Sequence, residues 1–207
     1  MTSLDLFLAL SVFAFASSIT PGPNNLMLLA SGANFGWRRT IPHLLGVTVG
    51  FVAMVALVGL GVMKLFALFP PLSVALKVLC AAYLIYLAIK IARTKPKTSQ
   101  TDATTKAQRP LTFWQAVAFQ WVNPKAWAMG LTAITVYAPP STGAAGVILV
   151  ALVFGLVNLP CCSTWMMLGT QIARLLRTEW RARAFNITAA TLLLISVAPM
   201  LIGGKGL

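Results

Sequence analysis

The sequence contains few charged residues, and acidic residues are the scarcest. Only 9% of the 207 residues are charged, and the carboxylates number three: Asp5, Asp102 and Glu179. Soluble domains carry about 25% charged residues, whereas 58% of this chain is hydrophobic. A soluble core of this size cannot bury so much apolar surface, so the sequence predicts a protein whose solvent is lipid.

The common catalytic and nucleotide-binding motifs are also absent. The sequence has no Walker motif, no HExxH, no CxxC and no nucleophile elbow. We therefore expect no ATP hydrolysis in this chain, no enzyme activity and no cofactor.

Cysteine is scarce and does not form a disulfide pattern. The three cysteines, Cys80, Cys161 and Cys162, are odd in number and lie inside apolar runs. The adjacent pair Cys161 and Cys162 could bind a soft metal, but small packing residues are the simpler interpretation.

Long apolar runs fill most of the chain. Each reaches the ~20 residues that a helix needs to cross ~30 Å of hydrocarbon. The sequence therefore predicts an all-α, multi-pass membrane protein with six transmembrane helices. The runs cover residues 4–33, 41–68, 72–92, 112–138, 143–173 and 184–203.

The net charge of +13 is concentrated in the loops. Twelve of the 16 Lys and Arg residues follow the first, third and fifth runs, whereas the opposite side holds only Lys64 and Lys205. This positive-inside bias predicts that the basic loops are cytoplasmic and both termini are outside, in the periplasm. Nucleic-acid binding is not expected, because no basic stripe is interleaved with exposed aromatics.

A polar linker at 93–110 divides the chain into 1–92 and 111–207, each with three apolar runs. The first half enters the membrane from outside and the second from the cytoplasm. We predict a single domain, 1–207, built from two inverted three-helix repeats, which is a common plan for transporters.

The first run is interrupted by the sequence TPGPNN at 20–25. Pro21, Gly22 and Pro23 break the backbone hydrogen-bond ladder, and a helix that restarts at Asn24 and Asn25 presents amides that favour an anion. In lipid, such freed backbone must be buried in protein or line a wet cavity. A substrate site is favoured here, and a packing kink is the alternative.

The fourth run is interrupted by Asn123, Pro124 and Lys125. Both interruptions lie ~15–20 Å from the cytoplasmic ends of their runs, near the midplane. A lysine at that depth costs ~3 kcal/mol to insert. We predict that Lys125 pairs with a substrate carboxylate, and bonding to freed carbonyls of the broken helices is the alternative.

Three further features have two interpretations each. Asn158, just before Pro160 in the fifth run, either binds a ligand or joins helices. His43, at the start of the second run, either titrates near neutral pH or is structural. Gly46 and Gly50 form a GxxxG pattern that serves close packing, either within the bundle or in a dimer.

Taken together, these stretches resemble the lysine exporter (LysE/RhtB) family of bacterial amino-acid efflux proteins. The matching segments are TPGPNN at 20–25, FGWRR at 35–39, LKVLCAAYLIYLAIK at 76–90, FWQAVAFQWVNPKAW at 113–127 and the Arg-rich stretch before the last run. The resemblance implies six helices in the bacterial inner membrane, a homodimer, and export driven by the proton motive force.

Within the family, the segment FQWVNPKAWAMGLTAITVY is most similar to the cysteine/O-acetylserine exporter subgroup. The resemblance assigns substrate binding to one set of residues: Pro21, Gly22, Pro23, Asn24, Asn123, Pro124 and Lys125. Lysine-exporting members carry an acidic residue in the second helix, and GVTVGFVAM has none. We therefore expect a small neutral substrate such as cysteine, O-acetylserine, homoserine or threonine.

Two rival functions remain open from the sequence. A metal or inorganic-ion exporter would use Cys161, Cys162 and His43 as ligands. A non-transporting membrane interaction protein would use the prolines as kinks and Lys125 as a structural cation.

Overall fold

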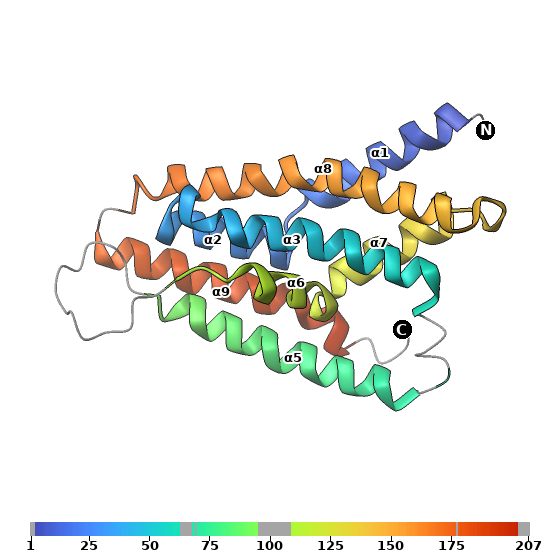
Figure 1. The fold of residues 1–207 in the computed structure, drawn as a ribbon. Helices are drawn as coiled ribbons and strands as arrows, with labels where there is room; N and C mark the ends of the chain where they lie inside the picture. Colours follow the sequence, from blue (N-terminus) through green and yellow to red (C-terminus); the bar gives the residue numbers. More distant parts are fainter. Residues whose placement is uncertain (1–2, 63–67, 69, 95–108, 177, 203–207) are drawn as a thin grey trace.

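The computed structural model describes residues 3–62, 68, 70–94, 109–176 and 178–202, and within them every regular element is a helix (Figure 1). The elements of the first half are α1 (Ser3–Ile19), α2 (Pro23–Phe35), α3 (Trp37–Leu57), the π-helical turn η1 (Val58–Val62) and α5 (Pro70–Ala92). Those of the second half are α6 (Phe113–Val122), α7 (Pro124–Tyr137), the 3-10 turn η2 (Pro140–Thr142), α8 (Gly143–Ile172) and α9 (Glu179–Ile202). The predicted all-α class is confirmed for this part of the chain.

Both predicted helix interruptions are present. α1 and α2 meet at an angle of 54° across the three residues between Ile19 and Pro23. α6 and α7 are separated by Asn123 alone. In each case the new helix begins with proline, whose missing amide hydrogen is tolerated at a first helical position.

Two of the described helices are long and apolar enough to cross a bilayer, Trp37–Gly61 and Gly143–Ile172. The bent pair of α1 and α2 makes a third if it crosses as one span. These numbers refer to the described residues only, and residues 95–108 of the expected linker lie outside them. The predicted total of six spans, the inverted repeats and the outside location of both termini stay predictions.

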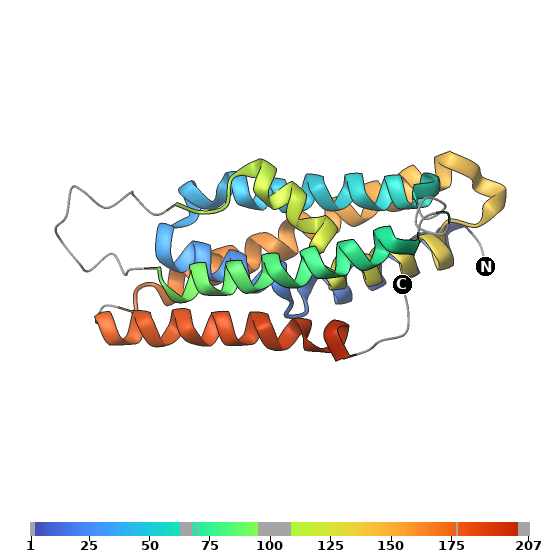
Figure 2. The ribbon, with the colours of Figure 1, turned by 90° about the horizontal axis from the view of Figure 1, so that it is seen from below.

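The two halves of the chain are interleaved, because helices of each half pack against several helices of the other. α8 contacts α1, α2 and α3, and α6 from the second half packs along α3 from the first. α5 and α9 lie next to each other, as Figures 1 and 2 show. The ends of α1 and α6 that carry the breaks are therefore brought into the middle of the bundle.

The GxxxG pattern of α3 faces α6. A Cβ atom on Gly50 would lie 2.7 Å from Val117 Cα, and one on Gly46 would overlap the carbonyl oxygen of Phe113. Both contacts are with backbone, which cannot move aside as a flexible side chain can. The glycines therefore allow α3 and α6 to approach within one chain, and the intramolecular interpretation of the pattern is confirmed.

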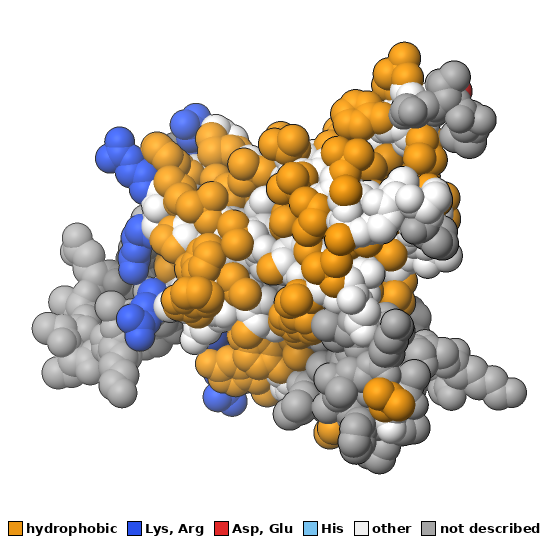
Figure 3. Space-filling model, turned by 45° about the vertical axis from the view of Figure 1, so that its right-hand side comes forward, with side chains coloured by type: hydrophobic (Ala, Val, Ile, Leu, Met, Phe, Trp, Pro, Cys, Tyr) orange, Lys and Arg blue, Asp and Glu red, His pale blue; other side chains and the backbone are white. Residues whose placement is uncertain are grey.

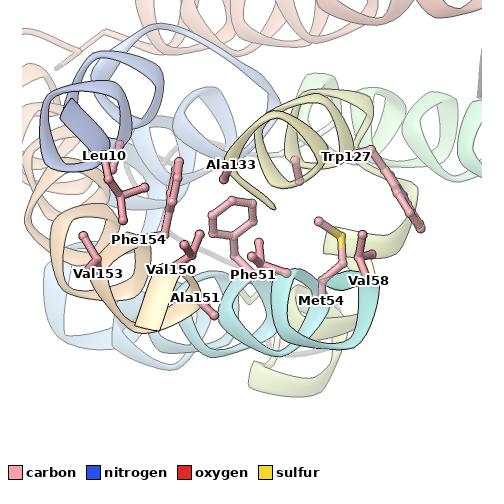
Figure 4. Close-up of a cluster of buried hydrophobic side chains, with 13 residues drawn as sticks. Leu10, Phe51, Met54, Val58, Trp127, Ala133, Val150, Ala151, Val153 and Phe154 are labelled. Carbon is pink, nitrogen blue, oxygen red and sulfur yellow. The ribbon is translucent and has the colours of Figure 1, made fainter. Parts of the chain in front are cut away.

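A cluster of buried apolar side chains lies between α1, α3, α7 and α8 (Figure 4). Its aromatic part is formed by Phe154, whose ring centroid is 5.5 Å from that of Phe51 and 5.8 Å from that of Phe13. Phe154 and Phe51 are fully buried. This cluster holds α1, the first half of the broken helix, against α8 and forms one wall of the candidate site.

The surface has an apolar body and a basic end. Figure 3 shows hydrophobic side chains over most of the visible face and Lys and Arg side chains along one end. Trp114 and Trp180, next to that end, are 75% and 69% exposed, as expected of interfacial anchors. The described basic residues beside the helix termini at this end are Arg38, Arg39, Lys90, Arg93, Arg109, Arg174, Arg181 and Arg183.

Candidate functional site

The two helix breaks meet through Lys125. Its Nζ donates hydrogen bonds to the carbonyl oxygen of Thr20 at 2.7 Å, to Thr20 Oγ1 at 2.8 Å and to the carbonyl oxygen of Pro21 at 3.3 Å. The side chain lies directly over Gly22, where a Cβ atom would be 2.6 Å from Lys125 Cδ. The ammonium thus bonds to freed backbone of the first break, which is the arrangement that the sequence left as the alternative.

The first break leaves the carbonyls of residues 17–21 without their usual helical donors. Pro21 and Pro23 have no amide hydrogen for the carbonyls of residues 17 and 19, and the bend between α1 and α2 separates the carbonyls of residues 18, 20 and 21 from the amides four residues on. Polar side chains of the break itself replace some of these donors. Thr20 Oγ1 donates to the carbonyl of Ser17 at 2.9 Å. Asn25 Nδ2 donates to the carbonyls of residues 18 and 20, both at 2.8 Å.

The remaining carbonyls are satisfied from the second half of the chain. Trp165 Nε1, on α8, donates to the carbonyl of Ile19 at 2.9 Å. Lys125, on α7, donates to those of Thr20 and Pro21. All five carbonyls of residues 17–21 therefore have side-chain donors, and two of the four side chains come from more than 100 residues away. The hydrogen bonding of the first break is therefore complete only when α7 and α8 are packed against it.

The second break is satisfied locally. Asn123 caps α7, because its Oδ1 accepts a hydrogen bond of 3.1 Å from the amide of Lys125. Trp127 Nε1 donates to the carbonyl of Trp121 at 2.9 Å, whose usual helical donor, the amide of Lys125, donates to Asn123 instead. Asn123 and Pro124 thus shape the break and orient Lys125 at the beginning of α7.

A pair of amides joins α2 to α6 next to the breaks. Asn24 Nδ2 donates to Gln120 Oε1 at 2.9 Å, and Gln120 Nε2 donates back to Asn24 Oδ1 at 3.2 Å. Gln120 Nε2 also donates to the carbonyl of Ala116. Gln120 is fully buried, and the sequence analysis did not select it. Its only signal was a polar side chain one turn before the NPK sequence.

Asn158 connects α3 and α8 to the first break. Its Nδ2 donates to Ser18 Oγ at 3.3 Å, and its Oδ1 accepts from Thr48 Oγ1 at 3.5 Å. Cys162 Sγ lies 3.5 Å from both Asn158 Oδ1 and Asn25 Oδ1. Asn158 therefore joins helices in this structure, and it also faces the candidate site.

A small cavity lies where these groups converge. The centre of a water-sized sphere can reach about 20 Å³ of it, which is the scale of single water molecules. Six predicted site residues line this cavity: Gly22, Asn24, Asn25, Asn123, Lys125 and Asn158. The lining also includes Ser17, Ser18, Phe51, Ala126 and Met129, which the sequence did not indicate. Pro21, Pro23 and Pro124 are not among the lining residues and act by breaking the helices.

The electrostatics of this cavity favour an anion. α2 begins at Pro23 and α7 at Pro124, so the N-terminal ends of two helices meet beside the Lys125 ammonium. Helix N-termini carry about half a positive charge each. None of the described residues that line the cavity is a carboxylate. The site can therefore offer a positive pole together with neutral amide, hydroxyl and carbonyl groups.

The metal site of the rival interpretation is not assembled. Cys161 and Cys162 are buried free thiols, and His43 lies elsewhere, with Nδ1 3.1 Å from Ser31 Oγ. Within the residues that the structure describes, no group of three His, Cys, Asp or Glu side chains is arranged to hold a metal ion. No structural observation therefore favours a metal exporter.

Comparison with known proteins gives one consistent result. The profile of the LysE type translocator family matches residues 15–203. The chain is 33% identical over 193 residues to a cysteine/O-acetylserine efflux protein of Escherichia coli K12, covering 91% of this chain and 93% of that protein. The protein of the same description from Escherichia coli O139:H28 is 32% identical over 194 residues, with 91% and 94% covered. No solved structure gives a significant match.

The match includes both helix breaks, Lys125 and all the residues that line the cavity. It extends over far more than half of the chain, and the relatives are similar along nearly their whole length. This chain belongs to the LysE type translocator family and is a membrane transporter rather than an enzyme.

Proposed function

We propose that this protein exports small neutral amino acids or their derivatives, of the cysteine and O-acetylserine type, across the bacterial inner membrane. The names of the relatives support this substrate class. The observation that carries the proposal is the environment of Lys125. Its three hydrogen bonds all end on neutral oxygen atoms, and no described carboxylate lines its cavity. The carboxylate of an amino acid would be the missing counter-charge.

Substrate binding is an exchange of partners. An ammonium has three donors, and in this structure those of Lys125 are used by Thr20 and Pro21. A carboxylate that binds Lys125 must displace at least one of these bonds. The carbonyls that are released can then accept hydrogen bonds from the ammonium of the same amino acid. Both charges of a zwitterion are satisfied in this way, whereas the side-chain cation of lysine would have no partner.

The same exchange couples binding to movement. The bonds from Lys125 tie α7 to the break between α1 and α2, so releasing them loosens the contact between the two halves of the chain. The cavity, on the scale of single waters, must widen to accept an amino acid. Substrate binding and opening of the bundle therefore favour each other, as alternating access requires.

The packing supports an inverted repeat, with α1 corresponding to α6, α2 to α7, α3 to α8 and α5 to α9. α1 packs on α8 as α6 packs on α3, and the corresponding helices α3 and α8, like α5 and α9, are neighbours. Three pairs of described helices depart from this symmetry. α2 packs closely along α8 while α7 touches α3 only slightly, and the packing of α2 on α9 and of α5 on α6 has no counterpart of similar extent between α7 and α5 or between α1 and α9. In this proposal six spans rock about the two breaks, with the basic end in the cytoplasm and both termini in the periplasm. The proposal also includes coupling to the proton motive force and a homodimer, because membership of the family implies both.

Counterflow in proteoliposomes tests the function. Vesicles with purified protein are preloaded with unlabelled cysteine, O-acetylserine, threonine or lysine, and uptake of the labelled compound is measured. We expect exchange of a neutral amino acid and little exchange of lysine. Replacement Lys125→Met, which keeps the length of the side chain and removes its charge, should abolish exchange. Arg38→Gln, which removes an exposed charge at the basic end, should not.

Two results would contradict the proposal. Exchange of lysine at the rate of a neutral amino acid would refute the charge argument. Absence of exchange with all four compounds, in protein whose thermal unfolding is cooperative, would refute amino-acid transport and favour a non-transporting role. Thermal unfolding of Lys125→Met must be followed in parallel, because the variant also removes a donor from the carbonyls of Thr20 and Pro21.

A further inference from the structure

A second cavity lies at the basic end of the molecule. It is bounded by the C-terminal half of α2, the beginning of α3, the end of α5 and the segment that leads into α6. Its polar lining includes Ser31, His43, Lys90 and Arg109, and Leu87 and Leu111 are among its apolar residues. The centre of a water-sized sphere can reach about 40 Å³ of it, twice the value at Lys125.

One ring nitrogen of His43, a residue that lines this cavity, has no hydrogen-bond partner in the structure. The side chain is 1% exposed, and its Nδ1 lies 3.1 Å from Ser31 Oγ. Among the described residues, Nε2 of His43 is the only buried side-chain nitrogen or oxygen without a hydrogen-bond partner. Buried polar groups in native proteins are almost always paired. An unpaired imidazole nitrogen on a residue that lines a cavity therefore points to a ligand that pairs with it.

The charges of the cavity define the ligand as an anion. Lys90 is partly buried on α5 and Arg109 is exposed just before α6, so two cations line one mainly apolar space. None of the described lining residues is a carboxylate. The Asn34 amide is already used, because its Nδ2 donates to Ala30 and Asn186. In the tautomer in which Ser31 Oγ donates to Nδ1, the imidazole carries its proton on Nε2 and can donate to an oxyanion together with the two cations.

α2 runs from this cavity to the Lys125 site. Ser31 and Asn24 lie on the same helix, seven residues or ~10 Å apart, and each lines one of the two cavities. The basic cavity is on the side that the loop charges assign to the cytoplasm. A cytoplasmic carboxylate that moves toward Lys125 along α2 would meet it first.

We infer that this cavity is a separate binding site for the carboxylate of the amino acid, held by His43 Nε2, Lys90 and Arg109 before the substrate reaches Lys125. The inference rests on the proposed function for the identity of the ligand. The phosphate of an anionic lipid has the same charge and acceptor chemistry, so the test separates the two sources.

The experiment uses the fact that the chain has one histidine. Protein labelled with ¹⁵N-histidine is placed in nanodiscs of phosphatidylcholine, and the two ring-nitrogen signals are followed while O-acetylserine or propionate is added. We expect a saturable shift of the Nε2 signal with both compounds. Lys90→Gln and Arg109→Gln should each weaken the apparent affinity by about tenfold. Lys125→Met and the exposed-charge control Arg38→Gln should leave the shift intact.

Four outcomes would overturn the inference, and the first three are no shift with either compound, an equal shift in the charge variants, and a shift that needs phosphatidylglycerol and ignores both carboxylates. The third result would assign the cavity to lipid. A shift that disappears in Lys125→Met would also overturn it, because the two sites would then be one.

Transport kinetics distinguish this inference from the proposed function. In proteoliposomes, the Lys90→Gln, Arg109→Gln double variant should raise the KM on the basic side by about tenfold or more and change the rate at saturation little. Unchanged kinetics in the double variant, with exchange lost in Lys125→Met, would refute the second site and leave the function standing. Absence of all exchange together with a saturable Nε2 shift would refute the function and leave an anion site.

Discussion

The two proline breaks of this protein are stabilised by different means. At the first break, three residues separate α1 from α2 and the helices are bent by 54°. Its freed carbonyls depend on Trp165 and Lys125, which lie on helices of the other half. At the second break, Asn123 alone separates α6 from α7, and the donors come from within six residues.

The first break depends on tertiary contacts, and we call it the hinge. The second break depends on local hydrogen bonds, and we call it the rigid corner. A break that is held from a distance can change when its distant partners move, and a break that is capped locally keeps its shape. Lys125 stands on the rigid corner and bonds to the hinge. A ligand that competes for Lys125 therefore acts on the part of the bundle that is able to respond.

The largest expected effect is that of Gly22→Ala at the first break. Gly22 has φ −174°, an extended conformation open to any residue, so the added methyl group causes no backbone strain. It would instead lie 2.6 Å from Lys125 Cδ and displace the side chain. We expect counterflow to fall by about tenfold or more. Gly130→Ala on α7, where a Cβ would meet Val55 Cγ2 at 3.2 Å, is the matched control. Equal loss in both variants would contradict the prediction.

Removing the indole donors compares the two breaks directly. Trp165→Phe removes the indole donor of the Ile19 carbonyl, and Trp127→Phe removes that of the Trp121 carbonyl. Each should destabilise the protein by about 1–3 kcal/mol. We expect the larger loss for Trp165→Phe, because it also removes a link between α8 and the hinge. Thermal unfolding in detergent measures both, and a larger loss for Trp127→Phe would reverse our ranking of the breaks.

Helix capping provides a smaller effect with a sharper control. Asn123→Ala removes the cap of α7, and Thr112→Ala removes the capping box of α6, which is formed with Gln115. Both should lower stability by about 1 kcal/mol. Only Asn123 lines the cavity and orients Lys125, so only Asn123→Ala should impair counterflow beyond its loss of folded protein. Equal transport in the two variants would show that the cap has no role in binding.

The smallest expected effect is the coupling between Asn24 and Gln120. Their two reciprocal hydrogen bonds, of 2.9 and 3.2 Å, link the hinge to α6. In a double-mutant cycle of the alanine variants, we expect a coupling of about 0.5–1.5 kcal/mol in the free energy of unfolding. Additive effects of the two substitutions would mean that this amide pair does not stabilise the contact between α2 and α6.

The sequence was a good guide to the breaks and a poor guide to what satisfies them. Pro21, Gly22, Pro23 and Pro124 act on their own backbone, so their effect can be predicted without a fold. Gln120 and Trp165 were not predicted, because neither residue belongs to a helix break. Their roles arise only when a carbonyl on a distant helix comes within hydrogen-bonding distance.

Lys125 shows the same limit. Its depth and its position after Asn123 and Pro124 were sufficient to predict an important cation, but not to choose between its two predicted partners, a substrate carboxylate and the freed carbonyls. The structure places its ammonium on Thr20 and Pro21, and the predicted pairing with a substrate carboxylate stays a proposal. An ammonium can bond to any nearby oxygen, and which oxygen is near is decided by helix packing.

The sequence by itself therefore determined the helical class, the apolar and basic regions and the positions at which two helices break, because these follow from local backbone chemistry and from the hydrophobicity of short segments. Only the tertiary structure decided that the two breaks meet, that Gly46 and Gly50 face α6, and that His43 is buried with an unpaired nitrogen beside Lys90 and Arg109. Those features depend on contacts between residues far apart in the chain, and such contacts are selected by the packing of whole helices.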